Sequence, residues 1–514
     1  MKTSVIAGAL LAGLLLGQSA AAAPTQPQPQ GIAWIAARSD ADIERALAQA
    51  GKQNKPVLLY WGASWCPPCN QLKATLFKRQ DFITQTRAVV PVNLDGDLPG
   101  AQRLGARFKV RGYPTLILLN PAGEEITRLP GEVDGAQVVE LLQLGLANGR
   151  GFGAVLADAR AGRALNANEW RMLGFYAWES DDGTVAPKER AALLGQLAQA
   201  AEPVAPEAAL RLRLKALSNS QEGQALPAGA AGQALVLQQL ASAQASREQL
   251  DVLAFGAARI VRALAPKPGE ARDALLAAYE PALRRLQADA GLARVDRLGA
   301  LLARVELARL DQPADSVRPG LPEPLLQEAR AFTAQQDREI SDGYERQSVI
   351  NWAAHVLGRA GLWSDSDALL KANLARSPDS YYLMSHLGGN ARAQGLKQQA
   401  LDWHGQAFAK SQGPATRLQW GASYLSELVQ LSPQDGARIE RTALQLLDEA
   451  AKDRGAFHGR SARSLQRASD ELLAWNQGPA LKRLRQRSAK LCAGLPADDE
   501  GQRKACAALL KPKA

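Results

Sequence analysis

Strand signals end at the glycine-rich stretch GLANGRGFG (residues 145–153), and this change of pattern divides the chain into two kinds of structure. Amphipathic segments before it predict helices after Ser39, after Cys66, near 101–107 and from 135 to 146. The short apolar runs between them predict β-strands at residues 33–37, 56–63, 88–94, 115–120 and 124–129. The order β-α-β-α-β-α-β-β-α predicts an α/β fold with a mixed sheet and helices on both faces.

The rest of the chain is rich in Ala, Leu, Arg and Gln, with apolar residues at helical spacing and short Gly/Pro turns. Antiparallel helices joined by short turns favour an all-α array. The proline-rich stretch LDQPADSVRPGLPEPL (310–325) divides this array. We therefore predict an α/β domain at residues 32–149 and helical regions at residues 154–309 and 326–514.

A repeat is visible in the last helical region. Gly361 and Gly395 lie 34 residues apart, which is the period of tetratricopeptide repeats. In that register Gly388, Ala400 and Ala407 fall where the two helices of a repeat cross closely, which only small side chains allow. The segment resembles about two tetratricopeptide repeats, and an irregular α-solenoid is the alternative. Either arrangement predicts a long groove suited to protein–protein binding.

The N-terminus has the pattern of a secretory signal peptide. Lys2 precedes an apolar run from Val5 to Leu16, and a stretch of small residues follows. The run is shorter than the ~20 residues that a membrane-spanning helix needs. We therefore expect a cleaved signal peptide (1–23), a Pro/Gln linker (24–31) and a periplasmic or otherwise secreted protein whose mature chain has no membrane span.

Basic residues exceed acidic ones, with 61 Lys and Arg against 51 Asp and Glu and a net charge of +10. A basic balance can indicate binding to nucleic acid or to an anionic membrane. Here the positive residues are interspersed with acids and form no long run, which is typical of a solvated helical surface. We expect no nucleic-acid partner.

The four cysteines form two pairs. Cys492 and Cys506 flank a GLPADDEGQ turn between two predicted helices near the C-terminus. In an oxidising compartment this arrangement favours a structural disulfide across a helical hairpin. Free thiols or a redox role are the alternatives.

Cys66 and Cys69 lie in YWGASWCPPCNQLK, between an apolar strand and a helix. This position puts Cys66 at a helix N-terminus, where free N–H groups and the helix dipole stabilise a thiolate. Pro67 and Pro68 donate no N–H, which the first turn of a helix tolerates. Cys69, one turn further on and more buried, can resolve a mixed disulfide on Cys66. We expect an exposed corner that carries a redox-active pair.

A metal site is the main alternative for such a pair, and structural zinc needs about four ligands. The four histidines all lie in the predicted helical regions without paired spacing: His355, His386, His404 and His458. We therefore predict no metal site, and no cofactor other than the Cys66–Cys69 disulfide itself.

WCPPC after a buried strand, followed by RGYPTLILL, resembles the thioredoxin superfamily over residues 31 to about 149. The resemblance implies that Cys66 is the attacking thiol and Cys69 the resolving one. It also implies that Pro114 is the cis-proline that packs opposite the disulfide. The sequence around WCPPC is more similar to exported thioredoxin-like domains, such as the C-terminal domain of membrane-embedded thiol:disulfide interchange proteins, than to thioredoxin itself.

The resemblance also implies roles for the neighbours of these residues. Trp65 is the aromatic cover beside the site, the backbone of Tyr113 pairs with substrate, and Thr115 continues the strand. The chain departs from thioredoxin where that protein keeps a buried acid and its lysine partner, because Tyr60 and Pro91 occupy those places. Proton transfer through Tyr60 or through water would replace the acid, or the domain would turn over slowly.

Two functions follow from this pattern. The first is an extracytoplasmic thiol–disulfide oxidoreductase that exchanges disulfides with cysteine-containing client or redox partner proteins, which the helical repeats recruit. The absence of a histidine between the cysteines favours a reducing or exchange role. The second is a periplasmic interaction scaffold whose thioredoxin-like domain has little turnover.

Overall fold

The computed structural model describes residues 31–129, 135–148, 150–180 and 184–511. The predicted signal peptide, and all but the last residue of the predicted linker, lie outside the described residues.

The N-terminal part of the chain forms one mixed five-stranded sheet with the strand order β1-β3-β2-β4-β5. Strands β1, β3 and β2 are parallel, whereas β4 runs antiparallel to β2 and to β5. This sheet confirms the predicted fold class. Its strands are β1 (Ile35–Ala37), β2 (Val57–Gly62), β3 (Val90–Asp95), β4 (Thr115–Leu119) and β5 (Glu125–Leu129).

Helices cover both faces of this sheet, because the residues of the central strand β2 point alternately to either side. Val57, Leu59 and Trp61 pack with α1 and α4, whereas Leu58 and Tyr60 pack with α2, α3 and α5. We call this part the α/β unit. Its helices are α1 (Asp40–Gln53), α2 (Pro67–Ala74), α3 (Gln80–Gln85), α4 (Ala101–Arg107) and α5 (Gly135–Asn148), with 3-10 turns η1 (Leu76–Lys78) and η2 (Thr86–Ala88).

Beyond α5 the described residues contain helices and no strand, as predicted. We call this part the helical region. Its long helices pack mainly on their neighbours in sequence, as α8 does on α9 and α19 on α20. The helices are α6 (Phe152–Arg160), α7 (Ala167–Phe175), α8 (Pro187–Ala201), α9 (Pro206–Ser218), α10 (Gly229–Ala241), α11 (Ala243–Glu248), α12 (Leu250–Leu253), α13 (Ala257–Leu264), α14 (Glu270–Ala288), α15 (Arg294–Ala308), α16 (Glu323–Glu339), α17 (Gly343–Arg359), α18 (Trp363–Asn373), α19 (Ser380–Ala393), α20 (Lys397–Lys410), α21 (Pro414–Leu431), α22 (Gly436–Lys452), α23 (Gly459–Trp475), α24 (Gly478–Ala493) and α25 (Glu500–Ala508), with 3-10 turns η3 (Trp178–Ser180) and η4 (Leu374–Arg376).

Two successive helical hairpins, α17–α18 and α19–α20, share one turn geometry. Gly361 and Gly395 end the first helix of each hairpin with a positive φ, 76° and 75°, which glycine adopts most easily. Within the second hairpin, a Cβ at Gly388 would lie 2.6 Å from Nε2 of His404, so only glycine lets α19 and α20 approach this closely. The tetratricopeptide assignment of these hairpins stays a prediction.

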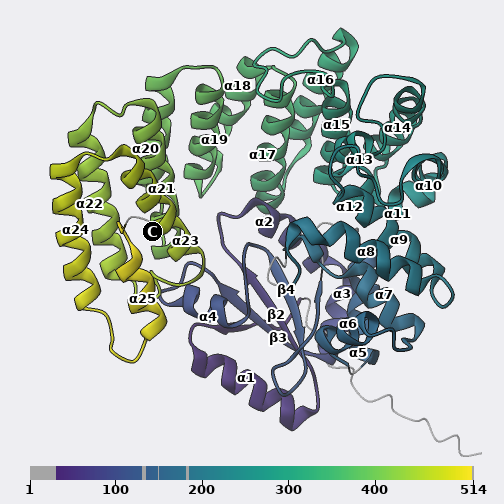
Figure 1. Cartoon of the computed structure of the whole chain (residues 1–514), viewed down its shortest axis with the longest axis horizontal. Helices are drawn as coiled ribbons and strands as arrows, with labels where there is room; N and C mark the ends of the chain where they lie inside the picture. Colours follow the sequence, from purple (N-terminus) through teal and green to yellow (C-terminus); the bar gives the residue numbers. More distant parts are fainter. Residues whose placement is uncertain (1–30, 130–134, 149, 181–183, 512–514) are drawn as a thin grey trace, which may run out of the picture.

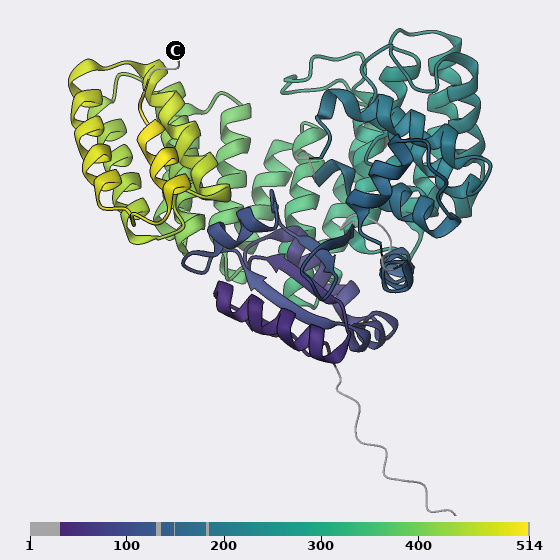
Figure 2. The same ribbon diagram turned by 60° about the horizontal axis from the view of Figure 1, so that its bottom comes forward.

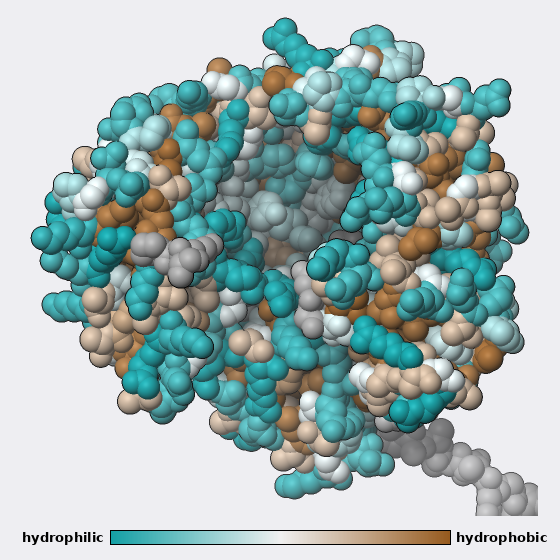
Figure 3. Space-filling model, in the orientation of Figure 1, coloured by the Kyte–Doolittle hydropathy of each residue, from teal (hydrophilic) through white to brown (hydrophobic). Residues whose placement is uncertain are grey.

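The helical region curves into an arc that starts beside the sheet and returns to the α/β unit at its far end (Figures 1 and 2). Helices α5 to α7 lie at the start of the arc, and α23 packs against α4 at its end. The space-filling view shows a hollow between the arc and the α/β unit, with hydrophilic residues along its rim (Figure 3). The α/β unit therefore contacts the arc near both of its ends, and α2 also packs against α17 in the middle of the arc.

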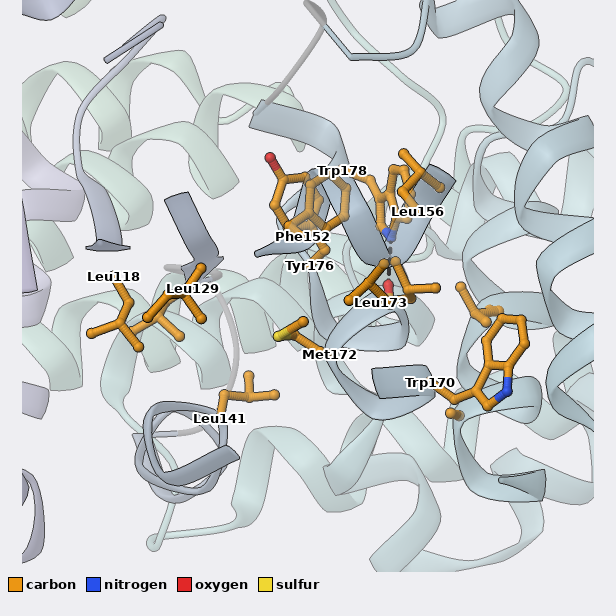
Figure 4. Packing of buried hydrophobic residues seen from close by; sticks show 14 of the residues in the cluster. Leu118, Leu129, Leu141, Phe152, Leu156, Trp170, Met172, Leu173, Tyr176 and Trp178 are labelled. Atoms are coloured by element: carbon orange, nitrogen blue, oxygen red, sulfur yellow. Dashed lines mark hydrogen bonds between the residues drawn. The ribbon is translucent and has the colours of Figure 1, made fainter. Parts of the chain in front are cut away.

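The first contact, which we call the sheet-side junction, is a continuous hydrophobic core (Figure 4). Phe152 stacks on Tyr176 with ring centroids 3.5 Å apart, and Trp178 meets both rings edge-on. The indole N–H of Trp178 donates to the carbonyl oxygen of Leu173 at 2.8 Å, so this buried donor is satisfied. The junction joins the sheet and α5 to α6, α7 and η3 through Leu118, Leu129, Leu141, Phe152, Leu156, Trp170, Met172, Leu173, Tyr176 and Trp178.

Candidate active site

Cys66 and Cys69 form a disulfide at the N-terminus of α2, with their Cα atoms 5.2 Å apart. The buried strand β2 leads to this corner, and Cys66 is the N-cap residue of the helix, followed by two prolines in its first turn. The Sγ of Cys66 accepts the backbone N–H of Cys69 at 3.2 Å. The same N–H and the helix dipole would stabilise a Cys66 thiolate after reduction.

The second predicted segment of the site begins β4. The Tyr113–Pro114 peptide bond is cis, and the hydroxyl of Thr115 donates to the carbonyl oxygen of Gly112 at 2.9 Å. Tyr113 lies against the ring of Trp65 with centroids 6.1 Å apart. Tyr113 and Trp65 line one cavity together with Cys66, whereas Pro114 and Thr115 do not line it.

Tyr60, the predicted carrier of a proton, lies away from this cavity in the core of the sheet. Its ring packs against Trp34 and Phe77 at 5.6 and 4.9 Å, and its hydroxyl has no hydrogen-bond partner among the described residues. Burial raises the pKa of Tyr60 far above its usual value. The phenol therefore keeps its proton at neutral pH, and the geometry gives no support to a role in proton transfer.

The corner that carries the cysteines is not exposed, contrary to the expectation from the sequence. Cys66 is 2% exposed and Cys69 is 0% exposed, because helices of the distant helical region pack over the motif. Trp65 stacks on Tyr382 of α19 with centroids 6.0 Å apart and meets Trp420 of α21 edge-on at 6.3 Å. Three aromatic residues from two parts of the chain thus cover one side of the disulfide.

Asp97, in the loop after β3, connects the helical region to Trp65 beside the disulfide. One carboxylate oxygen accepts the backbone N–H of Thr416 at 2.9 Å, in the first turn of α21, and the other accepts the Thr416 hydroxyl and the indole N–H of Trp65. The carboxylate thus caps a helix of the other region. Burial raises the pKa of Asp97, and the donors on Thr416 and Trp65 oppose that rise. Its partner Thr416 lies 319 positions away in sequence, so no local signal could have identified this contact.

Further polar contacts surround this cover. The backbone N–H of Gly100 donates to Asp453 at 3.0 Å, and the side chain of Gln102 accepts the backbone N–H of Arg460 at 2.8 Å. On the other flank of α2, the hydroxyl of Ser348 in α17 donates to Gln71 at 2.9 Å. We call this second contact, between the α2 motif, the 95–102 loop and helices α17, α19, α21 and α23, the motif-side junction.

The cavity beside Cys66 has a volume of about 360 Å³ and a strongly basic wall. The guanidinium of Arg460 lies over the rings of Trp65 and Tyr113, at 4.7 and 5.0 Å from their centroids. Partial desolvation at the cavity wall and the neighbouring arginines lower the pKa of Arg463, although the residue as a whole is exposed. The cavity is lined by Trp65, Cys66, Pro67, Pro68, Arg111, Gly112, Tyr113, Tyr382, Gln419, Arg460, Arg463 and Arg467.

A half-buried charged group follows the disulfide on α2. Lys73, four residues after Cys69, lies over the ring of Tyr344 at 5.2 Å and within electrostatic reach of Asp95 and Asp379. Burial lowers the pKa of Lys73 and raises that of Asp379, which accepts the hydroxyl of Tyr381 at 3.1 Å. Acids from β3 and from the helical region thus stand near α2, where the sequence showed no carboxylate within the motif.

The second cysteine pair lies apart from this cavity. Cys492 of α24 and Cys506 of α25 form a disulfide with Cα atoms 5.6 Å apart, and Cys506 is fully buried. Within the described part of the chain, no three His, Cys, Asp or Glu side chains are grouped as a metal site would require. Nor does any helix among those residues have the length and apolar character needed to cross a bilayer.

Comparisons with known proteins agree with this geometry for one part of the chain. Residues 43–145 match the family described as thioredoxin-like domain, so this segment is a thioredoxin-like domain. Over 106 residues the chain is 34% identical to thiol:disulfide interchange protein DsbD 2 of Pseudomonas aeruginosa, covering 20% of this chain and 18% of that protein. Over 136 residues it is 29% identical to thiol:disulfide interchange protein DsbD of Klebsiella pneumoniae, covering 26% and 22%.

The chain therefore spans only about a fifth of the length of these curated relatives. Among solved structures, a thioredoxin from Thermus thermophilus is 28% identical over 24% of this chain and 93% of its own, with a TM-score of 0.21. The family match lies within the α/β unit, and the two curated relatives match 20% and 26% of this chain.

Proposed function

We propose that the chain is an extracytoplasmic thiol–disulfide oxidoreductase in which Cys66 attacks and Cys69 resolves. The observation that carries this proposal is the Cys66–Cys69 disulfide at the N-terminus of α2, facing a cavity lined by Tyr113 and by cations. The names of the relatives that match this segment support the same chemistry. The signal-like N-terminus supports a periplasmic or secreted location.

The reduced form would act in two balanced steps. The Cys66 thiolate attacks one sulfur of a substrate disulfide, forms a mixed disulfide and releases the other substrate sulfur as a thiolate. The Cys69 thiolate then attacks the Sγ of Cys66 and releases the second substrate thiolate. Two electrons pass to the substrate and the Cys66–Cys69 disulfide remains, which an external dithiol must reduce again. The helix N-terminus and the guanidinium of Arg460 both favour the thiolate of Cys66.

The helical region would control access to this site and recruit a partner. Helices α19, α21 and α23 stand over Cys66, and the hairpins α17–α18 and α19–α20 repeat with the period of tetratricopeptide units. We propose that these hairpins are tetratricopeptide-like and that a cysteine-containing partner approaches along them. Trp65 and Tyr113 would contact that substrate, because both line the cavity beside Cys66.

The test is the dithiothreitol-driven reduction of bis(2-hydroxyethyl) disulfide by the full chain. We expect Cys66→Ser to lower the rate to the uncatalysed background. Cys69→Ser should accumulate a mixed disulfide on Cys66, visible by intact-protein mass spectrometry. A double variant, Cys492→Ala with Cys506→Ala, is the matched control because it removes the other disulfide and should keep the activity. Equal rates for the wild type and Cys66→Ser would end the proposal.

A second function has one observation in its favour. Because the helical region buries Cys66, the thioredoxin-like domain could serve mainly to hold an interaction scaffold together with little turnover. Partner binding that survives Cys66→Ala with Cys69→Ala, in a protein with no reductase activity, would favour this scaffold over the enzyme.

A further inference from the structure

Four arginines surround the opening to Cys66, and no acidic residue lines the same cavity. Arg111 comes from the loop before β4, while Arg460, Arg463 and Arg467 come from α23. In the described part of the chain, none of the four guanidinium groups forms an ion pair with a carboxylate. The α/β unit and the end of the helical region thus bring their positive charges together at one place.

These charges are only partly offset from behind. Asp97 lies within electrostatic reach of Arg460 and offsets part of its charge, while its two oxygens accept hydrogen bonds from the uncharged donors of Thr416 and Trp65. The second guanidinium, on Arg463, donates to the backbone carbonyl oxygen of Arg111 at 2.8 Å, which brings no negative charge. Like charges this close raise the free energy of the folded protein unless an anion joins them.

The cavity also limits the shape of what can reach the sulfur. Its volume of about 360 Å³ is near the lower end of the ~300–1,000 Å³ typical of small-molecule sites. Helices α19, α21 and α23 form walls around it, and Cys66 is 2% exposed. A disulfide on the surface of a folded protein would collide with these helices, whereas a small compound or a flexible segment can enter.

We infer that Cys66 acts on an anionic disulfide, one with carboxylates next to the sulfurs, carried by a small thiol compound or by a flexible acidic peptide. This inference rests on the proposed function and adds its substrate class. Arginine suits the role because its planar guanidinium binds a carboxylate through two parallel hydrogen bonds. Arg463 and Arg467 are exposed on α23, at the mouth of the cavity, so their guanidinium groups are accessible to an incoming carboxylate.

The exchange on such a substrate balances without a further reagent. The Cys66 thiolate forms a bond to one substrate sulfur as the substrate S–S bond breaks, and a carboxylate-bearing thiolate leaves. Attack by the Cys69 thiolate on Cys66 then breaks the mixed disulfide and releases the second anionic thiolate. The substrate gains two electrons and the protein becomes the disulfide, to be reduced by a dithiol.

The test compares three small disulfides of similar length and different charge on the reduced full chain. They are 3,3′-dithiodipropionate, bis(2-hydroxyethyl) disulfide and cystamine, which carry two negative charges, none and two positive charges. Single-turnover oxidation of the protein is followed by quenching and alkylation of free thiols. At low ionic strength we expect the dianion to react about tenfold faster than the dication, with the neutral compound between them. Salt should shrink the ratio, since the Debye length falls to about 10 Å at 0.1 M.

Charge variants locate the effect. In Arg463→Gln with Arg467→Gln, the ratio of dianion rate to neutral rate should fall about twofold, because two of the four charges are lost. The neutral disulfide serves as the internal reference for the reactivity of Cys66. Arg318→Gln removes one positive charge from an exposed site in the loop between α15 and α16, and should keep the wild-type ratio.

The outcomes separate the two proposals. If none of the three disulfides oxidises the protein, the proposed function fails. If all three react at equal rates, or cystamine reacts fastest, the function stands and the inference fails. Two peptides with one disulfide each, flanked by Glu or by Gln, distinguish the sources: a faster Glu peptide supports a flexible segment. If both peptides react slowly and at equal rates while the small dianion reacts fastest of the small disulfides, the substrate is a small thiol compound.

Discussion

The two junctions between the α/β unit and the helical region are built differently. The sheet-side junction joins neighbouring segments of the chain through stacked rings and aliphatic side chains such as Phe152 and Leu173. The motif-side junction joins segments more than 260 residues apart through a helix cap at Asp97, backbone hydrogen bonds and a basic cavity. The first is part of one domain core. The second has the mixed polar and aromatic composition of an interface between proteins.

This difference separates stability from access to the disulfide. A core of fully buried side chains resists change, since each lost side chain leaves a cavity. A polar interface depends on a few directed contacts, and here those contacts meet at Trp65, next to Cys66. Substitutions at the first junction should therefore unfold the chain, and substitutions at the second should expose the cysteines.

The largest effect is expected at the sheet-side junction. Phe152→Ala removes a ring that stacks on Tyr176 and should lower the free energy of unfolding by about 3–5 kcal/mol. Chemical denaturation of the full chain measures the loss. Phe152→Leu keeps most of the volume and is the matched control, with a smaller loss. If the alanine variant loses less than about 1 kcal/mol in the free energy of unfolding, this junction is not part of the hydrophobic core.

Acid should weaken the helical region next, because all four histidines lie beyond residue 354 and none lies in the α/β unit. Burial, with His355 nearby, lowers the pKa of His386 to about 4, against about 6.5 in an unfolded chain. The unfolded state thus binds the proton more readily, so stability is complete above pH 6.5 and is lost as the pH falls toward 4. At about 1.4 kcal/mol for each pH unit, the loss reaches up to about 3 kcal/mol.

The measurement is the free energy of unfolding between pH 7 and pH 4 for the wild type and His386→Gln. Subtracting the two curves removes the contribution of the carboxylates, and the variant should show the flatter curve. Parallel curves for the two proteins would contradict the effect of His386.

A smaller loss is expected at the motif-side junction. Asp97→Ala leaves the first turn of α21 without its cap and the buried indole N–H of Trp65 without an acceptor, at a cost of about 2 kcal/mol. In the reduced protein Cys66 should then react faster with a bulky maleimide, while Phe152→Leu should not show this change. Asp97→Asn keeps one acceptor oxygen and should have a weaker effect. Unchanged alkylation in Asp97→Ala would show that this contact does not control access.

The smallest effect is expected at the rim of the same junction. Lys78 pairs with Asp342 at 2.5 Å, with side chains 55% and 32% exposed. Exposed ion pairs contribute about 0.2–1 kcal/mol, so Lys78→Gln should change the free energy of unfolding by no more than this. A loss above about 1 kcal/mol would contradict the assignment of this contact as a weak, solvent-exposed ion pair.

The sequence predicted the α/β fold and the helical array because both depend on patterns within about twenty residues. The apolar run of β2, the cap at Ser39 and the CPPC spacing are local signals of that kind. The cover over the disulfide could not be predicted, since Asp97 meets Thr416 across 319 positions and neither belongs to a motif. The prediction that Cys66 is exposed was wrong for the same reason, because a strand-to-helix corner is exposed only if no distant segment packs on it.

The position of the α/β unit between both ends of the arc has a further consequence. Because the sheet-side junction tethers the two surfaces, the motif-side junction forms within one molecule, at an effective concentration in about the millimolar range. Even a weak interface would then stay closed most of the time. A free protein that binds the same surface of α21 and α23 would have to displace the α/β unit from it. It would therefore need a Kd well below that effective concentration, or a high concentration of its own.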